Sequence, residues 1–382
     1  MTKKDVLLVI SPTQADRFNG IAQFAKGHGW NIMIEKDIPT SSIGWQGDGA
    51  IVMLKDNPTL VRFVRRLLSR HVPVVDLILS RPDIHLPRVC GDSESMGRLA
   101  AAHFEEHAFR NLAFFASNWS PVHALRYKGF CPSNGDRPRP ARWIWRENAK
   151  KQQYNNWKAF ENWLSPLLTT ATKPLGIFCY SDYDAMRVAN VCRLLGLSIP
   201  DEVAILGVDD NTLICENQPV PLSSVQHSLF DIGYRGAEML HRLMTETKPY
   251  KESCPQILIP PKGISVRRST DTIATGNPIF RNALSYIDQH LSEAFGCAEI
   301  AAAIGIPRVR LDRLFAAELG RSAGKEILRQ RLLRAKTMLR ESDAPLETIA
   351  TACGFCHAAH LSNTFRHRIG ITPGAYRTSC IR

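Results

Sequence analysis

The stretch that decides the fold of the C-terminal part is residues 299–320, which read EIAAAIGIPRVRLDRLFAAELG. Consecutive small alanines let two helices approach closely, and Gly305 permits a sharp turn between them. Leu311, Leu314 and Phe315 recur at spacings of three and four, so they form one buried helical face. A short helix, a glycine turn and a second helix together predict a helix-turn-helix unit.

The same pattern returns further along the chain, in residues 346–377, which read LETIATACGFCHAAHLSNTFRHRIGITPGAYR. No strand signal follows residue 278. We predict helices at 278–292, 298–304, 308–319, 323–340, 346–353 and 358–368. The C-terminal part is therefore predicted to be all-α, with two helix-turn-helix units joined by an arginine-rich helix.

The charge of this part favours nucleic acid as a partner. Residues 276–382 carry 15 Lys and Arg against 9 Asp and Glu, which is half of the net +12 in less than a third of the chain. The predicted helix at 308–319 exposes Arg308, Arg310 and Arg313. Arginines on a rigidly supported helix can enter the major groove of DNA, where they bond to guanine.

Specific residues in the second unit and the connecting helix resemble the AraC/XylS family of transcription regulators. They are Arg334-Ala335-Lys336, Leu339, Ile349-Ala350, Gly354-Phe355, Phe365, Gly370, Thr372-Pro373 and Tyr376-Arg377. The resemblance covers roughly residues 278–377 and implies that the second helix of each unit reads DNA. By position it implies that DNA is bound by Arg308, Val309, Arg310, Asp312 and Arg313 in the first unit, and by Ala359, His360, Asn363, Arg366 and Arg368 in the second.

Two departures from the family pattern bear on this assignment. Pro307 replaces the usual serine, so the capping hydroxyl is absent, although proline is tolerated at a helix start. Asn363 stands where an arginine is frequent. We therefore expect the second unit to read sequence weakly and to hold mainly the DNA backbone.

Metal binding and enzymatic activity are not predicted. Cys353, Cys356, His357 and His360 are zinc-ligating residue types, but zinc requires ligands that converge at about 2.0–2.3 Å. We expect Cys353 to face the core and His360 to face DNA, so packed or surface residues are favoured over a metal site. The sequence holds no Pro-Cys-His-Arg, Gly-x-Ser-x-Gly or phosphate-loop motif, and no cofactor is expected.

The composition is that of a soluble globular protein. The chain has 382 residues, which suggests two or three domains, with 44% hydrophobic and 22% charged residues. Apolar runs such as Val6–Ile10 are too short for a membrane span or a signal peptide. The ten cysteines are scattered and are interpreted as reduced thiols. We therefore expect a cytoplasmic protein without a membrane partner.

The first 270 residues alternate strand and helix signals. Strands are predicted at 5–11, 49–54, 111–116, 175–179 and 203–208, and helices at 19–26, 60–70 and 184–195. This alternation of strands and helices indicates parallel sheets covered by helices on both faces. Residues 271–277 are predicted to be a linker, which leaves 1–270 and 278–382 as the two domains.

Charged side chains mark the ends of several predicted strands. Asp92, Asp182 and Asp209 each follow a strand, and Arg126 begins a helix. Each alone is best interpreted as a helix cap or a solvated loop end. Together they favour a ligand cleft, because ligands of parallel sheets bind at the carboxyl ends of the strands.

These segments resemble the sugar-sensing domain of LacI-type repressors and periplasmic sugar-binding proteins over about residues 5–268. The matching pieces are Gly20-Ile21-Ala22, Gly47-Asp48-Gly49, Asp92, Arg126-x-x-Gly129-Phe130, Ser181-Asp182, Ala185 and Leu206-Gly207-Val208-Asp209. The resemblance implies a two-lobed α/β fold that clamps a sugar between its lobes. It assigns sugar binding to Asp92, Arg126, Asp182 and Asp209, and Asp16 and Arg17 are further candidates to face the cleft.

The order of the parts resembles regulators of pentose catabolism. It implies an activator that acts as a homodimer, responds to D-xylose or another pentose, and works with RNA polymerase on promoter DNA. The alternative is a constitutive DNA-binding regulator whose first domain binds a non-pentose ligand or none.

Overall fold

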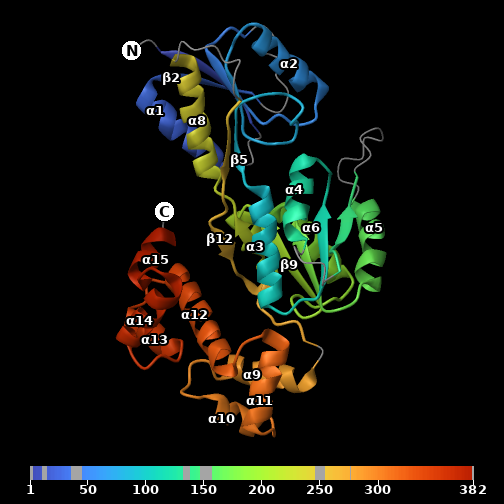
Figure 1. Cartoon of the computed structure of the whole chain (residues 1–382), viewed down its shortest axis with the longest axis vertical. Coiled ribbons are helices and arrows are strands. Elements are labelled where there is room, and N and C mark those ends of the chain that lie inside the picture. Colours follow the sequence, from blue (N-terminus) through green and yellow to red (C-terminus); the bar gives the residue numbers. More distant parts are fainter. Residues whose placement is uncertain are drawn as a thin grey trace. The chain divides into compact units, whose positions relative to one another are not determined.

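The computed structural model describes residues 3–10, 15–35, 45–131, 138–146, 157–245, 254–275 and 277–380 (Figure 1). The chain divides into two compact units. The first consists of Met1–Glu105 and Phe109–Ile273, and the second of Glu106–Ala108 and Ala274–Arg382. Among the described residues, no helix combines the length and the apolar character that a membrane span requires.

The first unit begins with a six-stranded parallel sheet in the order β11-β5-β4-β3-β1-β2. Successive side chains of β1 point to opposite faces of the sheet. Val6 and Leu8 pack in one hydrophobic core with α1 and α8, and Leu7 and Val9 pack in a second core with α2. Both faces are thus buried, as is typical of parallel sheets. The elements are β1 (Lys4–Val9), α1 (Ala15–His28), β2 (Trp30–Glu35), β3 (Gly49–Val52), α2 (Pro58–Ser69), β4 (Val74–Asp76), β5 (Arg88–Gly91), α8 (Leu229–Thr245) and β11 (Gln256–Ile259).

A second six-stranded sheet has the order β12-β10-β9-β8-β6-β7 and is parallel except for the pairing of β12 with β10. Phe160 of α5 and Val188 of α6 pack on one face. On the other, the ring of Phe130 in α4 contacts those of Phe104 in α3 and Phe178 in β8. The elements are α3 (Ser93–Glu106), β6 (Asn111–Ala116), α4 (Pro121–Phe130), β7 (Ala141–Ile144), α5 (Trp157–Thr170), β8 (Leu175–Cys179), α6 (Asp182–Leu194), β9 (Val203–Val208), α7 (Thr212–Cys215), β10 (Ser223–Gln226) and β12 (Gly263–Ser265).

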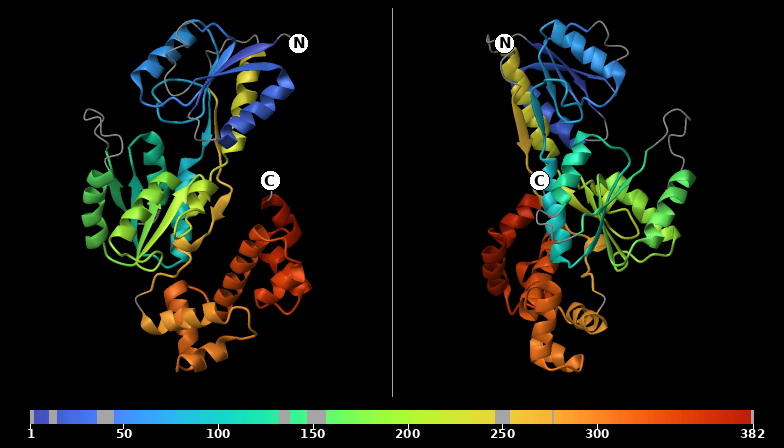
Figure 2. Two further views of the ribbon diagram at one scale, coloured as in Figure 1. Left: turned by 180° about the vertical axis from the view of Figure 1, so that it is seen from behind. Right: turned by 45° about the vertical axis from the view of Figure 1, so that its right-hand side comes forward.

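The chain passes between the two sheets three times, after β5, after β10 and between β11 and β12. Each sheet with its helices therefore forms one lobe of the first unit, and the helices cover both faces of each sheet (Figure 2). The predicted two-lobed α/β fold is confirmed.

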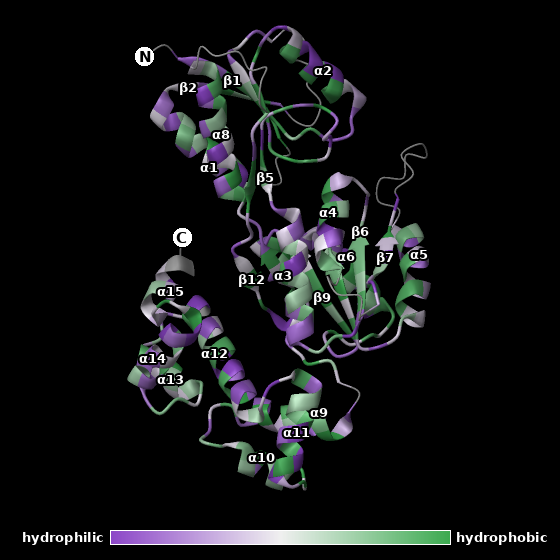
Figure 3. Cartoon of the chain, in the orientation of Figure 1, coloured by the Kyte–Doolittle hydropathy of each residue, from purple (hydrophilic) through white to green (hydrophobic). Residues whose placement is uncertain are grey.

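The described residues of the second unit form helices and connecting loops, with no strand, and they include the two predicted helix-turn-helix pairs. α10 and α11 form the first pair and α13 and α14 the second, and the turns hold Gly305 and Gly354 at φ of 70° and 72°. Hydrophilic and apolar residues mix along the connecting helix α12 (Figure 3). The helices are α9 (Pro278–Gln289), α10 (Cys297–Ala303), α11 (Arg308–Leu319), α12 (Ala323–Glu341), α13 (Leu346–Ala352), α14 (Ala358–Ile369) and α15 (Pro373–Cys380).

The helix α15 is absent from the sequence-based prediction, which has no helix after residue 368. Its start is specified locally, because Pro373 occupies the first turn and the Thr372 hydroxyl accepts a hydrogen bond from the Ala375 amide at 3.2 Å. Tyr376 then packs its ring edge against Phe365, with centroids 5.5 Å apart. The family marks at Thr372-Pro373 and Tyr376 thus have a structural role.

Candidate functional site

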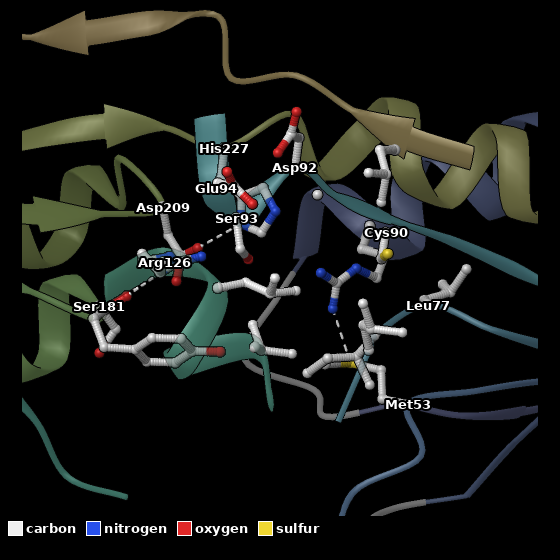
Figure 4. A pocket seen from close by; sticks show the side chains of 18 of the residues that line it. Met53, Leu77, Cys90, Asp92, Ser93, Glu94, Arg126, Ser181, Asp209 and His227 are labelled. Carbon is white, nitrogen blue, oxygen red and sulfur yellow. Dashed lines mark hydrogen bonds and ion pairs between the residues drawn. The ribbon is translucent and has the colours of Figure 1, made fainter. Parts of the chain in front are cut away.

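A cavity of about 620 Å³ lies in the first unit and is lined by residues of both lobes (Figure 4). Its polar lining comes from the carboxyl ends of strands and from the helices that follow them. Three of the four sugar-binding candidates line it, namely Asp92, Arg126 and Asp209. The apolar part of the lining includes Met53, Leu77, Ile78, Cys90, Val122, Leu125 and Leu258.

Asp92 follows β5 directly and caps α3. Its carboxylate accepts hydrogen bonds from the Ser95 amide at 2.9 Å and the Ser95 hydroxyl at 2.5 Å. Negative charge is favourable at the amino end of a helix. Ser93 and Glu94, in the first turn, also line the cavity. The carboxylate therefore serves as a helix cap and also borders the cavity.

Arg126 on α4 is only 3% exposed. Its guanidinium lies 4.4 Å from the centre of the Tyr180 ring and donates hydrogen bonds to the Tyr180 carbonyl and, at 3.1 Å, to the sulfur of Met96. Its Nε is buried and has no hydrogen-bond partner among the described residues. Burial lowers the pKa of Arg126. A buried guanidinium with an unused donor beside a cavity is suited to bind an oxygen-rich ligand.

Asp209 follows β9 and adopts a φ of 110°, which is uncommon for a residue with a side chain. Its carboxylate accepts a hydrogen bond of 2.9 Å from Nδ1 of His227. Burial lowers the pKa of His227. A neutral imidazole that donates from Nδ1 has its lone pair on Nε2. That Nε2 is buried without a hydrogen-bond partner among the described residues.

His227 lines the cavity but is absent from the sequence-based candidates. It follows β10, where the chain leaves the second sheet. Its position directly after a strand is the one feature of the sequence that could have identified His227 as a site residue. Gly91 makes room for this ring, because a Cβ at that position would lie 2.3 Å from Nε2 of His227.

Asp182, the fourth sugar-binding candidate, is not among the residues that line the cavity. The residue is 1% exposed, and its carboxylate accepts hydrogen bonds from the Ser224 hydroxyl at 2.6 Å and the Asn211 amide at 2.8 Å. Burial and the charge of Asp209 raise its pKa to about 7. The side chain therefore braces the loop that carries Asp209 and lies behind the site.

Arg17 lines the cavity, as anticipated for this segment, whereas Asp16 is not among the lining residues. Arg17 is 3% exposed and donates a hydrogen bond of 2.8 Å to the sulfur of Met53. Desolvation lowers its pKa to about 10. The cavity thus contains two buried guanidinium groups, which come from α1 and α4.

In the second unit, the predicted DNA-binding residues lie on the outer faces of the two candidate reading helices, α11 and α14. Leu311 and Phe315 bury the inner face of α11, and Leu361 and Phe365 bury that of α14. Of the ten predicted residues, Asp312 is half-buried and nine are exposed, namely Arg308, Val309, Arg310, Arg313, Ala359, His360, Asn363, Arg366 and Arg368.

The starts of the two candidate reading helices, α11 and α14, differ. Pro307 at the start of α11 makes no side-chain cap, as predicted. At the start of α14, Nδ1 of His357 accepts a hydrogen bond of 3.1 Å from the His360 amide. Cys353 is buried with its sulfur 3.8 Å from that of Met338. The described part of the chain contains no group of three or more metal-ligating side chains arranged to hold an ion.

Comparison with known proteins agrees with both units. Residues 101–270 match the family model of the periplasmic binding protein-like domain, and residues 300–379 match that of a helix-turn-helix domain. The xylose operon regulatory protein of Escherichia coli K12 is 26% identical over 91% of this chain and 89% of its own length. The corresponding protein of Haemophilus influenzae is 24% identical over 94% of each.

Solved structures show the same fold. The structure of the xylose-binding transcription activator xylR matches with a TM-score of 0.62 at 22% identity and covers 99% of each chain. A complex of the transcriptional regulator CelR with cellobiose matches with a TM-score of 0.55 at 20% identity, over 69% of this chain and 84% of that one. The chain is therefore a transcription regulator that combines a periplasmic binding protein-like domain with a helix-turn-helix domain, and it is similar over nearly its whole length to the xylose operon regulatory proteins.

Proposed function

We propose that this regulator is switched by a small sugar that binds in the cavity of the first unit. The observation that carries the proposal is a pair of buried, unused polar atoms at this cavity, Nε of Arg126 and Nε2 of His227. Leaving such an atom unsatisfied costs about 1–3 kcal/mol. A sugar hydroxyl both donates and accepts, so it can donate to the imidazole while another oxygen accepts from the guanidinium.

The cavity also supplies groups that suit the rest of a sugar. The carboxylates of Asp92 and Asp209 have further lone pairs with which to accept hydrogen bonds from hydroxyl groups. Leu77, Met53 and the other apolar lining residues suit the C–H faces of a sugar ring. Because the relatives are regulators of xylose operons, D-xylose and other pentoses are the first candidates.

The sugar would act by population shift. A ligand that contacts both lobes binds a closed arrangement better than an open one and therefore favours closure. We assign the sensing function to residues 1–270, the linker to 271–277 and DNA binding to 278–382. In this proposal the regulator is a homodimer that activates a pentose catabolic operon through RNA polymerase, and the ten residues on α11 and α14 contact its DNA.

The sensing claim is tested by titrating D-xylose, L-arabinose and D-ribose while promoter DNA binding is followed by fluorescence anisotropy. We expect one pentose to change the DNA affinity of the wild type. Asp209→Asn, which weakens the contact to His227, should reduce the affinity for that pentose, measured by calorimetry, by about tenfold or more. Asp201→Asn, an exposed aspartate outside the cavity lining, is the matched control and should behave as the wild type. DNA affinity unaffected by every sugar would favour a constitutive regulator.

The DNA-reading claim is tested by a pair of arginine variants. Arg313→Ala should cost about 1–3 kcal/mol at the cognate site and little on random DNA, if this side chain contacts a base. Arg366→Ala should weaken binding to both DNAs about equally and reduce the salt dependence, as expected for a phosphate contact. Equal losses on both DNAs for Arg313→Ala would show that it contacts only the backbone.

A further inference from the structure

Residues 267–270, immediately before the predicted linker at 271–277, include three polar residues that are buried. Ser269 and Thr270 are 0% exposed, and Arg267 is 9% exposed. Buried polar groups are almost always hydrogen-bonded, so their partners show what the segment is attached to. Because the linker follows directly, any shift of this segment moves the start of the linker.

Arg267 attaches the segment to the loop that carries Asp209. Its guanidinium forms an ion pair of 2.8 Å with Asp210 and donates a hydrogen bond of 3.1 Å to the Leu222 carbonyl. Asp209, the residue before Asp210, borders the cavity, and both aspartates have positive φ. A ligand that displaces the Asp209 carboxylate therefore also displaces Asp210 and, through the ion pair, Arg267.

Two hydroxyl groups connect Arg267 to the helix α3. The Ser223 hydroxyl donates to the Arg267 carbonyl at 2.9 Å, and the Thr270 hydroxyl donates to that of Ser223 at 2.7 Å. A hydroxyl has one proton to donate, so the Thr270 oxygen accepts from Nε2 of His103, which lies 2.9 Å away. The donors therefore run in one direction, from α3 through the two hydroxyls to Arg267.

The helix α3 connects His103 to another part of the cavity lining. Asp92 caps the helix, and Ser93 and Glu94 in its first turn line the cavity. His103 lies ten residues after Ser93, about 15 Å along the helix axis. Residues Glu106–Ala108, which begin with the last residue of α3, belong to the second unit. One continuous helix therefore leads from the cavity to the second unit.

We propose that the hydrogen bond between His103 and Thr270 couples sugar binding in the cavity to the DNA-binding unit. It joins the two connections that leave the cavity, α3 and residues 267–270, at the point where the linker begins. A sugar held by Asp92 and Asp209 acts on both connections at once. His103 and Thr270 are buried, so they are positioning residues and do not bind sugar or DNA themselves. The inference rests on the proposed function, in which this cavity binds a sugar.

The test uses the full chain and measures the factor by which saturating D-xylose changes the dissociation constant for promoter DNA, by fluorescence anisotropy. If the wild type responds instead to L-arabinose or D-ribose, that sugar is used. Thr270→Val removes the hydroxyl and nearly keeps the shape of the side chain. We expect the factor to fall about fivefold, as for the loss of one hydrogen bond, or to one where the wild-type factor is smaller. Sugar affinity without DNA, measured by calorimetry, should stay at that of the wild type.

Two control variants separate the hydrogen bond from other effects of substitution. Thr270→Ser keeps the hydroxyl and loses only the methyl group, so it should retain the wild-type factor. Thr170→Val removes an exposed threonine hydroxyl that bonds the Pro166 carbonyl at the end of α5. It should also behave as the wild type, because this hydroxyl lies outside the connection.

His103→Leu breaks the same hydrogen bond from the other side and keeps the test decisive if Thr270→Val does not fold. It should reduce the factor as much as Thr270→Val does, and the double variant should lose no more than either single variant, because both remove one contact. The inference is overturned if both single variants keep the wild-type factor, if their losses add, or if Thr270→Ser loses as much as Thr270→Val. A wild type whose DNA affinity responds to none of the three pentoses would instead overturn the proposed sensing function.

Discussion

Replacing Gly129 with alanine tests how the close packing of α3 and α4 positions the cavity side chains. A Cβ at Gly129 would lie 2.0 Å from the carbonyl oxygen of Glu94, and one at Gly97 would lie 2.1 Å from that of Arg126. A carbon–oxygen contact ordinarily requires about 3.3–3.6 Å. The backbones of the two helices would therefore have to separate by more than about 1 Å.

Such a separation would affect both stability and ligand binding. Overpacking of this kind costs about 1–3 kcal/mol, which lowers the thermal midpoint of the first unit by roughly 2–12 °C. Arg126 lies one turn before Gly129 on α4, and Glu94 is in the first turn of α3. A displacement of about 1 Å between these groups should weaken a hydrogen bond to the sugar worth about 1–3 kcal/mol, and so reduce sugar affinity by about fivefold or more.

The measurements are differential scanning fluorimetry and calorimetric titration with the pentose that the wild type binds. Gly27→Ala is the matched control, because Gly27 is exposed within α1 and a Cβ there would meet nothing within 4 Å. It should stabilise the protein by about 0.5–1 kcal/mol and leave sugar affinity unchanged. A Gly129→Ala variant with the midpoint and the sugar affinity of the wild type would refute the reasoning.

Two further predictions concern buried residues of each unit. The pKa of Asp182 is raised from 3.8 to about 7. Between about pH 4 and 7 the folded state therefore binds a proton that the unfolded state has released. As a result, the free energy of unfolding decreases as the pH rises through this range. Asp182→Asn should therefore show a smaller drop in thermal midpoint from pH 5 to pH 8 than the wild type, and equal drops would contradict the raised pKa. Phe365→Ala removes a fully buried ring packed against Tyr376 and should cost about 3–5 kcal/mol. The thermal unfolding of the second unit should report this loss, and an unchanged midpoint would exclude a central role for the ring.

The sequence pattern predicts the bounds of the candidate reading helices closely because those bounds are set by residues at the helix ends themselves. The helix predicted at 308–319 is observed with the same bounds as α11, between Pro307 and a left-handed Gly320. Three strands, at 111–116, 175–179 and 203–208, also match their predicted bounds. Each is a short, mainly apolar run, and its flanking residues include a proline or a charged or polar side chain, so the ends are well marked in the sequence. The short α15 has no comparable apolar pattern, and its start depends on the cap at Thr372.

The cavity is harder to predict from sequence because it is assembled from distant segments. Asp92 and Asp209 are found because each follows a strand. Arg126 is found because the sequence pattern places it at the start of the helix after a strand, although it lies in the middle of α4. His227 follows β10, which the pattern does not predict as a strand, so its proximity to Asp209 depends on the passage of the chain between lobes. Asp182 has the same strand-then-acid signal as Asp209, yet only one of the two lines the cavity.

The difference between these two carboxylates follows from how the loop after β9 is held. Asp209 and Asp210 both have positive φ, at 110° and 53°, a conformation that costs of order 1–3 kcal/mol for such residues. Asp182 accepts a hydrogen bond from the Asn211 amide, and Asp210 pairs with the guanidinium of Arg267 at 2.8 Å. These contacts stabilise the strained backbone of the loop after β9. In this conformation the Asp209 carboxylate points toward His227 and the cavity. The buried Asp182 carboxylate thus holds the loop in which Asp209 borders the cavity. Removing the Asp182 carboxylate should therefore weaken ligand binding, although Asp182 does not contact the ligand itself.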